Sequence, residues 1–243
     1  MTKVVCIVSG GMDSVTLLHK AVKELGKENV HVLNFHYGSK HNNKERPMAK
    51  KNAKKLGVPY TEINLDYMNK LWKSDLLKSG GKIPEGHYAE SNMKATVVPF
   101  RNGILLANAI GFAESVGADE VWYGNHAGDH VVYPDCRLEF TQLMNKAGVA
   151  GTYNKVRIVS PFVKLSKADI VKIGRDLGVN YRDTWSCYVG GWKPCLKCGT
   201  CIERAEAFHL ACYYDPLLSF EDWHKAVDNY KEAKEKFEKE EKK

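Results

Sequence analysis

The sequence predicts an α/β fold built around a parallel sheet. Short apolar segments of strand length alternate with longer segments in which apolar residues recur at helical spacing. The first apolar segment, residues 4–8, runs directly into the turn SGG, and apolar residues then mark one face of a helix. Repeated strand and helix units of this kind give parallel sheets that are covered by helices on both faces.

The elements can be placed in order along the chain. Strands are predicted at residues 4–8, 30–37, 60–65, 120–123 and 156–159. Helices are predicted after residue 14 and at residues 46–56, 102–116, 138–147 and 167–177. Residues 66–96 are rich in glycine and break the alternation, which predicts a long loop that acts as an active-site lid. A charged helical tail is expected at 219–243, with its last turns frayed.

Length and composition fit one soluble domain. The chain has 243 residues, of which 44% are apolar and 27% charged, as in ordinary globular proteins. Single α/β domains reach this size, so residues 1–243 are expected to form one domain. The first residues lack an export-signal pattern, and no apolar run approaches membrane-spanning length. We therefore expect a cytoplasmic protein without membrane contact.

The formal net charge of +7 does not by itself indicate nucleic-acid binding. Much of the lysine lies in residues 40–55 and 225–243. Solvated helix faces and a charged tail account for such runs. Nucleic acid is therefore not expected as a partner.

The turn after the first strand is a candidate anion site. Residues 9–14, SGGMDS, lie where an open parallel sheet binds its ligands, at the carboxyl end of a strand. Glycines let phosphate oxygens approach the backbone, and the next helix adds unpaired N–H groups. Ser9 and Ser14 add hydroxyl donors, and Asp13 is expected to cap the helix beside Mg²⁺. The alternative is a plain strand-to-helix turn.

A Walker motif is absent, since no lysine stands at the turn. The segment instead resembles the S-G-G-x-D-S motif of the ATP pyrophosphatase (pyrophosphate-loop) superfamily, whose members adenylate a carbonyl oxygen and release pyrophosphate. This resemblance implies an adenine nucleotide hydrolase-like, Rossmann-like fold that binds ATP with Mg²⁺. The ATP-binding residues that it implies are Val8, Ser9, Gly10, Gly11, Met12, Asp13, Ser14, Val15, Thr16, Leu17 and Leu18.

Four of the seven cysteines form a candidate metal site near the C-terminus. Cys187, Cys195, Cys198 and Cys201 have the spacing C-x₇-C-x₂-C-x₂-C. Four thiolates make a closed tetrahedral site, which predicts structural Zn²⁺ within a subregion at residues 187–201. An iron–sulfur cluster and a chance group of buried thiols are the alternatives.

Other cysteines and two histidines have weaker signals. Cys6 and Cys212 are expected to be small buried apolar residues. Cys136 is either a packed thiol or a nucleophile. His126 and His130 lie on a predicted loop, where hydrogen bonding or plain exposure is favoured over metal binding.

Several segments together resemble the 7-cyano-7-deazaguanine synthase family of queuosine biosynthesis. They are the loop at 9–14, YGSKH at 37–41, VPFRN at 98–102, YPDCR at 133–137 and the cysteine cluster. The resemblance implies that 7-carboxy-7-deazaguanine is adenylated and captured by ammonia as an amide. The amide oxygen is then adenylated and lost as AMP, which leaves the nitrile preQ0. A homodimer is also implied.

Catalytic roles are expected for Asp13, Arg101 and Lys167. Arg101 opens a helix, and its fixed charge can stabilise a phosphate or the transition state. Lys167 corresponds to a family lysine, which implies a place near the phosphates. A surface arginine and a solvated lysine are the alternatives.

The segment 133–137 supplies the expected substrate-binding residues, Tyr133, Asp135 and Arg137. Asp135 can accept hydrogen bonds from the N1–H and amino group of a guanine-like base, and helix capping or turn formation is its alternative. The chain departs from the family pattern at residues 39–40, where Ser-Lys replaces Gln-Arg. It also departs at His126 and residues 130–132, which puts the form of the base pocket in doubt.

Two other functions stay open. One is an enzyme with the same loop that stops at the amide, or that modifies an RNA base. The other is a zinc-stabilised nucleic-acid-binding protein, suggested by the positive charge and by Trp185, Tyr188 and Trp192 beside the cysteines.

Overall fold

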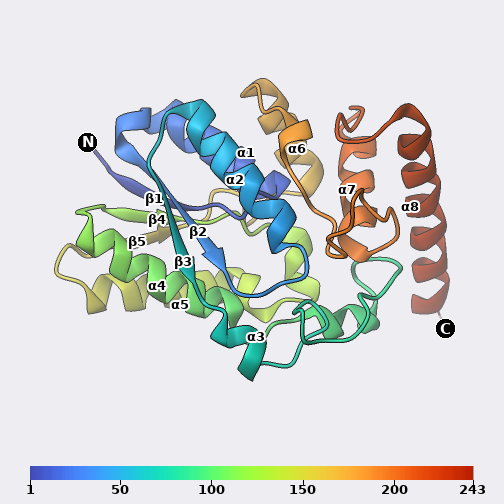
Figure 1. The fold of residues 1–243 in the computed structure, drawn as a ribbon, viewed down its shortest axis with the longest axis horizontal. Coiled ribbons are helices and arrows are strands. Elements are labelled where there is room, and N and C mark those ends of the chain that lie inside the picture. The colour runs from blue at the N-terminus through green and yellow to red at the C-terminus, as the bar shows by residue number, and fades with distance from the viewer. Residues whose placement is uncertain (243) are drawn as a thin grey trace.

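The sheet has five parallel strands, and helices cover both of its faces (Figure 1). The structure, a computed structural model, describes residues 1–242 and their side chains except those of residues 130 and 131. The strands are β1 (Val4–Ile7), β2 (Val30–His36), β3 (Tyr60–Asn64), β4 (Glu120–Trp122) and β5 (Arg157–Val159). Their order is β3-β2-β1-β4-β5. The winding direction therefore switches between β1 and β4, where open α/β sheets bind their ligands.

Alternate residues of the strands point into two apolar cores. On one face, Val5 of β1 packs in a core with Leu106 of α4 (Arg101–Ser115), and α5 (Leu138–Gly151) covers the same face. On the other face, Val4 and Cys6 share a core with Leu18 of α1 (Met12–Leu25). Helices α2 (Asn42–Leu56) and α6 (Lys167–Asp176) lie on this second side (Figure 1). Burial on both faces explains why β1, at the centre of the sheet, is a continuous apolar run, whereas the edge strand β3, YTEIN, is more polar and partly exposed.

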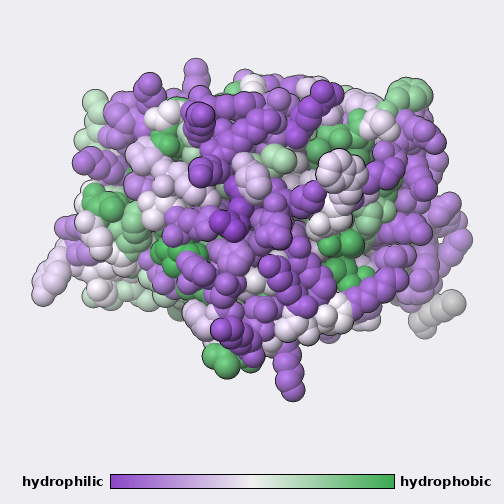
Figure 2. All heavy atoms as spheres, viewed as in Figure 1, coloured by the Kyte–Doolittle hydropathy of each residue, from purple (hydrophilic) through white to green (hydrophobic). Residues whose placement is uncertain are grey.

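The C-terminal part forms a separate helical layer at one end of the molecule. Helix α7 (Gly199–Leu210) packs against α8 (Phe220–Glu241), drawn in orange and red in Figure 1. A third apolar core joins them, and it includes Ile202, Ala226 and Tyr230. Charged and polar side chains cover most of the face in Figure 2, in keeping with solvated lysines. None of the described helices is both long and apolar enough to cross a membrane.

The predicted alternation of strands and helices is confirmed, with differences at several boundaries. Helix α2 begins at Asn42, four residues before the predicted start. The predicted loop at 66–96 contains α3 (Tyr67–Leu71) and a 3₁₀ helix at Ser91–Thr96. Helix α7 was not predicted. Cys6 is buried as expected, but Cys212 is exposed because it lies in the turn after α7 with a left-handed φ of 53°.

Candidate active site

Hydrogen bonds within the loop between β1 and α1 help to hold its shape, and Asn34 and Trp185 donate to its carbonyl oxygens. The hydroxyl of Ser9 accepts a hydrogen bond from Gly11 N at 3.1 Å, and the hydroxyl of Ser14 accepts one from Gly10 N at 3.3 Å. Gly10 has φ 109°, and a Cβ there would lie 2.1 Å from the carbonyl oxygen of Glu45, so only glycine fits. The first turn of α1 thus presents its N–H groups to the carboxyl edge of the sheet.

Asp13 does not cap this helix, contrary to the expectation. The N-cap residue is Gly11, which has no side chain to form a cap, and Asp13 follows within the first turn. Its carboxylate instead approaches Lys167, with Oδ2 lying 3.3 Å from Nζ. The Oδ1 atom is buried without a hydrogen-bond partner. Asp13 is therefore free to contribute an oxygen to a bound cation.

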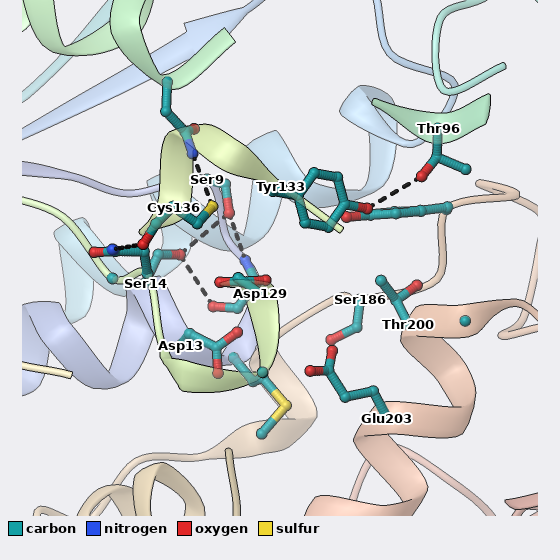
Figure 3. Close-up of a pocket in the computed structure, with 18 of the residues that line it drawn as sticks. Ser9, Asp13, Ser14, Thr96, Asp129, Tyr133, Cys136, Ser186, Thr200 and Glu203 are labelled. Atoms are coloured by element: carbon teal, nitrogen blue, oxygen red, sulfur yellow. Dashed lines mark hydrogen bonds between the residues drawn. The ribbon is translucent and has the colours of Figure 1, made fainter. Parts of the chain in front are cut away.

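The loop opens into a cavity of about 220 Å³. The walls come from α1, the start of α4, the segment after β4, the predicted lid and the start of α7. Ser9, Asp13 and Ser14 enter from one side, and Glu203 and Thr200 of α7 enter from another (Figure 3). The expected ATP-binding residues Ser9, Gly11, Met12, Asp13 and Ser14 line the cavity. Leu17 and Leu18 are instead fully buried in the core, where they support the helix.

A charged cluster lies beside the glycine loop. Lys167 begins α6, and its Nζ lies 2.6 Å from Oε2 of Glu203 as well as near Asp13. Burial by itself lowers the pKa of Lys167, but the charges of Asp13 and Glu203 outweigh it and raise that pKa above its usual value. Lys167 is therefore a partly buried, charged group in the cavity wall and not a solvated lysine.

His126 faces three carboxylates in the same cluster. Its Nε2 lies 3.5 Å from Asp129, 3.6 Å from Glu203 and 4.0 Å from Asp13, and makes no hydrogen bond. Its Nδ1 accepts a hydrogen bond from Gly128 N, so the neutral ring carries its proton on Nε2. Hydrogen bonding, and not exposure, therefore describes this buried residue. The side chain of His130 lies outside the described residues.

Arg101 occupies an aromatic part of the cavity. Its guanidinium donates to the Tyr37 hydroxyl at 3.3 Å and lies over the rings of Tyr37 and Tyr133 at 5.8 and 6.0 Å. The Tyr133 hydroxyl lies 3.1 Å from that of Thr96, and Tyr188 also lines this side. Arg101 is thus a cavity residue, as expected, and the tyrosines provide flat apolar faces around its charge.

Asp135 and Arg137 of segment 133–137 do not line the cavity. Asp135 Oδ2 accepts a hydrogen bond from Asn102 N, at the start of α4, at 2.8 Å. The alternative of helix capping therefore describes this side chain, which does not line the cavity. Arg137 is exposed at the N-cap of α5, also outside the cavity lining. Burial raises the pKa of the Cys136 thiol well above its usual value, as expected of a packed thiol and not of a nucleophile.

Ser39 and Lys40, which differ from the Gln-Arg of the family pattern, have a structural role. The ammonium of Lys40 donates to the carbonyl oxygens of Asp75 at 2.7 Å, Gly80 at 3.2 Å and Leu77. Ser39 is fully buried and pairs with Leu77 in an isolated bridge. Lys40 therefore fastens the first part of the predicted lid to the end of β2.

The four cysteines come together as predicted. Their sulfur atoms all lie within 4.8 Å of one another, and Cys195 and Cys201 are 3.9 Å apart. Four sulfurs at about 2.3 Å from one zinc ion would be separated by about 3.8 Å, so the set fits a tetrahedral metal. Backbone N–H groups of Cys195 and Cys198 point at the sulfurs of Cys187 and Cys195. The cluster lies behind the N-terminus of α7 and not in the cavity.

Glu203, Asp129 and Tyr37 are cavity residues that were not predicted. Glu203 stands one turn into α7, an element whose place over the sheet has no local sequence signal. Asp129 lies in a short 3₁₀ helix, Ala127–Val131, which the sequence pattern did not indicate. Only Tyr37 stood in a segment that resembles the family, and this was the one available signal.

Comparison with known proteins identifies the family of the chain. The family model described as queuosine biosynthesis protein QueC matches residues 3–212. A 7-cyano-7-deazaguanine synthase of Porphyromonas gingivalis is 51% identical over 86% of this chain and 94% of its own length. The enzyme of the same name from Archaeoglobus fulgidus is 44% identical over 96% of each chain. Among solved structures, the U34-tRNA thiolase NcsA from Methanococcus maripaludis, with its [4Fe-4S] cluster, matches 95% of this chain and 71% of its own. It does so at 14% identity and a TM-score of 0.46, too weak a likeness to inform the metal or the substrate.

The glycine loop, the residues that line the cavity and the cysteine cluster all lie within residues 3–212, the part of the chain that the family model matches. The chain belongs to the queuosine biosynthesis protein QueC family.

Proposed function

We propose that the protein converts 7-carboxy-7-deazaguanine, ATP and ammonia into 7-cyano-7-deazaguanine through an adenylated carboxylate and an adenylated amide. The observation that carries this proposal is that a glycine loop followed by a helix N-terminus, and a partly buried arginine among tyrosines, line one cavity. An acid group bound at Arg101 would thus share its space with the phosphates of ATP. The names of the matched relatives support the product.

The loop end of the cavity suits ATP with Mg²⁺. Backbone N–H groups of residues 9–14 would bind the phosphates, with Lys167 adding a fixed positive charge. Four carboxylates line the cavity against two cationic side chains, an excess that favours a divalent cation with the nucleotide. Asp13, Asp129 and Glu203 are the residues that would hold Mg²⁺, and the unpartnered Asp13 Oδ1 supports this choice.

The aromatic end suits the base. Tyr133 and Tyr188 offer rings on which a flat heterocycle can stack, and Arg101 can pair with its carboxylate. Arg101 would then orient one carboxylate oxygen towards the α-phosphorus and shield the charge of the transition state. Asp135 would act by positioning Asn102 at the start of α4, and any role of Arg137 in substrate binding is left to mutation.

The chemistry requires two activations because neither a carboxylate nor an amide has a usable leaving group. The carboxylate oxygen attacks the α-phosphorus and releases pyrophosphate. Ammonia then displaces AMP and forms the amide with loss of a proton. The amide oxygen attacks the α-phosphorus of a second ATP and releases a second pyrophosphate. Loss of AMP and of the two protons on nitrogen then leaves the carbon–nitrogen triple bond. The cavity contributes positioning and charge stabilisation, and no enzyme nucleophile is needed.

Zn²⁺ is proposed for the cysteine cluster as a structural ion. Four sulfurs close its coordination sphere, so no position remains for substrate. Cys198 is the N-cap of α7, and fixing it would fix Thr200 and Glu203 in the cavity wall. We also propose a single domain that works as a cytoplasmic homodimer, which light scattering of the purified protein tests.

The test is to incubate purified protein with 7-carboxy-7-deazaguanine, ATP, Mg²⁺ and ammonium and to analyse the products by mass spectrometry. We expect the nitrile, with two AMP and two pyrophosphate released for each molecule formed. An amide that accumulates as the end product would identify an amide-forming ligase instead. If neither amide nor nitrile forms and no AMP is released, the proposal is wrong.

A further inference from the structure

The part of the lid that reaches the cavity is residues 83–93, called the inner lid below. Ile83, Tyr88 and Met93 of this segment line the cavity. The loop that carries the cysteine cluster holds the first half of the inner lid, because Glu85 forms an isolated β-bridge with Cys198 and Gly86 N donates to the carbonyl oxygen of Lys197 at 3.0 Å. These contacts fix where the inner lid begins, but they do not orient the side chain of Tyr88.

Helices α7 and α8 orient the second half. The Tyr88 hydroxyl donates to Oε2 of Glu206 at 2.7 Å, and Lys234 of α8 lies 3.3 Å from the other carboxylate oxygen. The buried His87 ring is stacked between two aromatic rings. Tyr88 lies 4.2 Å away on one side, and Phe237 of α8 lies 4.5 Å away on the other at an interplanar angle of only 15°.

We propose that α8 is a positioning element of the active site, which holds Tyr88 in the cavity wall through Phe237 against His87 and Lys234 against Glu206. The whole of α8 lies beyond residue 212, where the match to the family model ends. The helix therefore lies outside the part of the chain that the family model matches, and it acts on the cavity through the inner lid and not through the glycine loop.

A stacked contact of this kind is open to test by single substitutions on one helix. Phe237→Ala removes the ring that covers His87, and Phe237→Tyr keeps it. Lys231→Ala is the matched control, because Lys231 is exposed on the same helix and alanine preserves helical propensity. If Phe237→Ala lowers the melting temperature of the whole protein, Phe237→Leu replaces it, since leucine keeps apolar bulk without stacking.

The structural readout is hydrogen exchange of the backbone amides at residues 83–93 in the ligand-free protein. We expect roughly three- to tenfold faster exchange in Phe237→Ala, with residues 9–14 unchanged, and wild-type exchange in Phe237→Tyr and Lys231→Ala. Unchanged exchange in Phe237→Ala, or equal acceleration in Lys231→Ala, would overturn the proposal.

The kinetic readout rests on the proposed function. We expect a roughly three- to tenfold higher KM for 7-carboxy-7-deazaguanine in Phe237→Ala, with KM for ATP and kcat within about twofold of wild type. A loss confined to kcat, or shared equally by both substrates, would contradict a role in positioning Tyr88. If the wild-type protein has no turnover, the proposed function fails, and the exchange measurement still decides the role of α8.

Discussion

The glycine loop and the inner lid are held in different ways. The hydroxyls of Ser9 and Ser14 accept hydrogen bonds within the loop itself, from Gly11 N and Gly10 N, while Asn34 and Trp185 donate to carbonyl oxygens of the loop. The inner lid is held by residues more than a hundred positions away, as in the contact of Tyr88 with Glu206. The glycine loop therefore has hydrogen bonds of its own within six residues, whereas the position of Tyr88 in the inner lid depends on the packing of the C-terminal helices.

The largest expected effect comes from a substitution in the glycine loop. Gly10→Ala places a Cβ at φ 109°, within 2.1 Å of the carbonyl oxygen of Glu45. A strained backbone position of this kind costs about 1–3 kcal/mol, and the clash must also move the loop. We expect ATP-dependent AMP release to fall by at least about tenfold and the free energy of unfolding to fall by about 2 kcal/mol or more.

Gly111→Ala is the matched control for this prediction. Gly111 lies in α4, where a Cβ would meet no atom within 4 Å, and alanine favours a helix over glycine by about 1 kcal/mol. Activity should therefore be unchanged and the unfolding midpoint equal or higher. Equal activity in Gly10→Ala and wild type would show that the loop backbone does not need glycine to work.

The same contrast explains what the sequence could predict. The strand, the glycine turn and the cysteine spacing are local patterns, and the structure confirms each of them. The pairing of Lys167 with Glu203 spans 36 residues and depends on how α7 is placed, which no periodicity encodes. The expected capping by Asp13 failed because Gly11 takes the N-cap position and leaves Asp13 inside the helix.

Segment 133–137 shows that even a local motif does not predict the direction of each side chain. Its residues follow one another in sequence, but only Tyr133 and Cys136 line the cavity. Asp135 turns away to the backbone of Asn102, because the start of α4 has an N–H group that needs an acceptor. The sequence motif at 133–137 thus correctly indicated a segment that lies at the cavity. Which of its side chains enter the cavity depended on their neighbours in the folded protein.

A moderate effect is expected at residues 75–80, the first part of the predicted lid, which Lys40 holds in place. Lys40→Met removes an ammonium that donates to three backbone carbonyls between residues 75 and 80. Hydrogen bonds to a charged group contribute about 1.5–3 kcal/mol, so the free energy of unfolding should fall by about 1–3 kcal/mol. Denaturant unfolding measures this loss, and exchange of the amides at 75–80 should accelerate more than that of residues 9–14.

Lys78→Met provides the comparison, since Lys78 is exposed in the same segment. It removes the same charge without removing the contacts to the three carbonyls. A stability loss in Lys78→Met as large as that in Lys40→Met would mean that net charge, and not the fastening of residues 75–80, accounts for the effect.

The smallest expected effect is a pH dependence of stability, to which α1 and the inner lid each contribute one histidine. His19 of α1 and His87 of the inner lid both have pKa values lowered from 6.5, in each case chiefly by burial. The unfolded chain then binds more protons than the folded chain just below pH 6.5, so stability is complete above this pH and is lost as the pH falls. Carboxylates titrate mostly at lower pH, which leaves the window between about pH 5 and 7 to histidines.

The midpoint of thermal unfolding should therefore decrease as the pH is lowered from 7 to 5, and His19→Gln should reduce the slope of this decrease. After correction for the intrinsic slowing of amide exchange by acid, the protection of residues 83–93 should still fall with pH in that variant, because His87 belongs to the lid and not to the helix behind the loop. An unchanged slope in His19→Gln would exclude His19 as a source of the dependence.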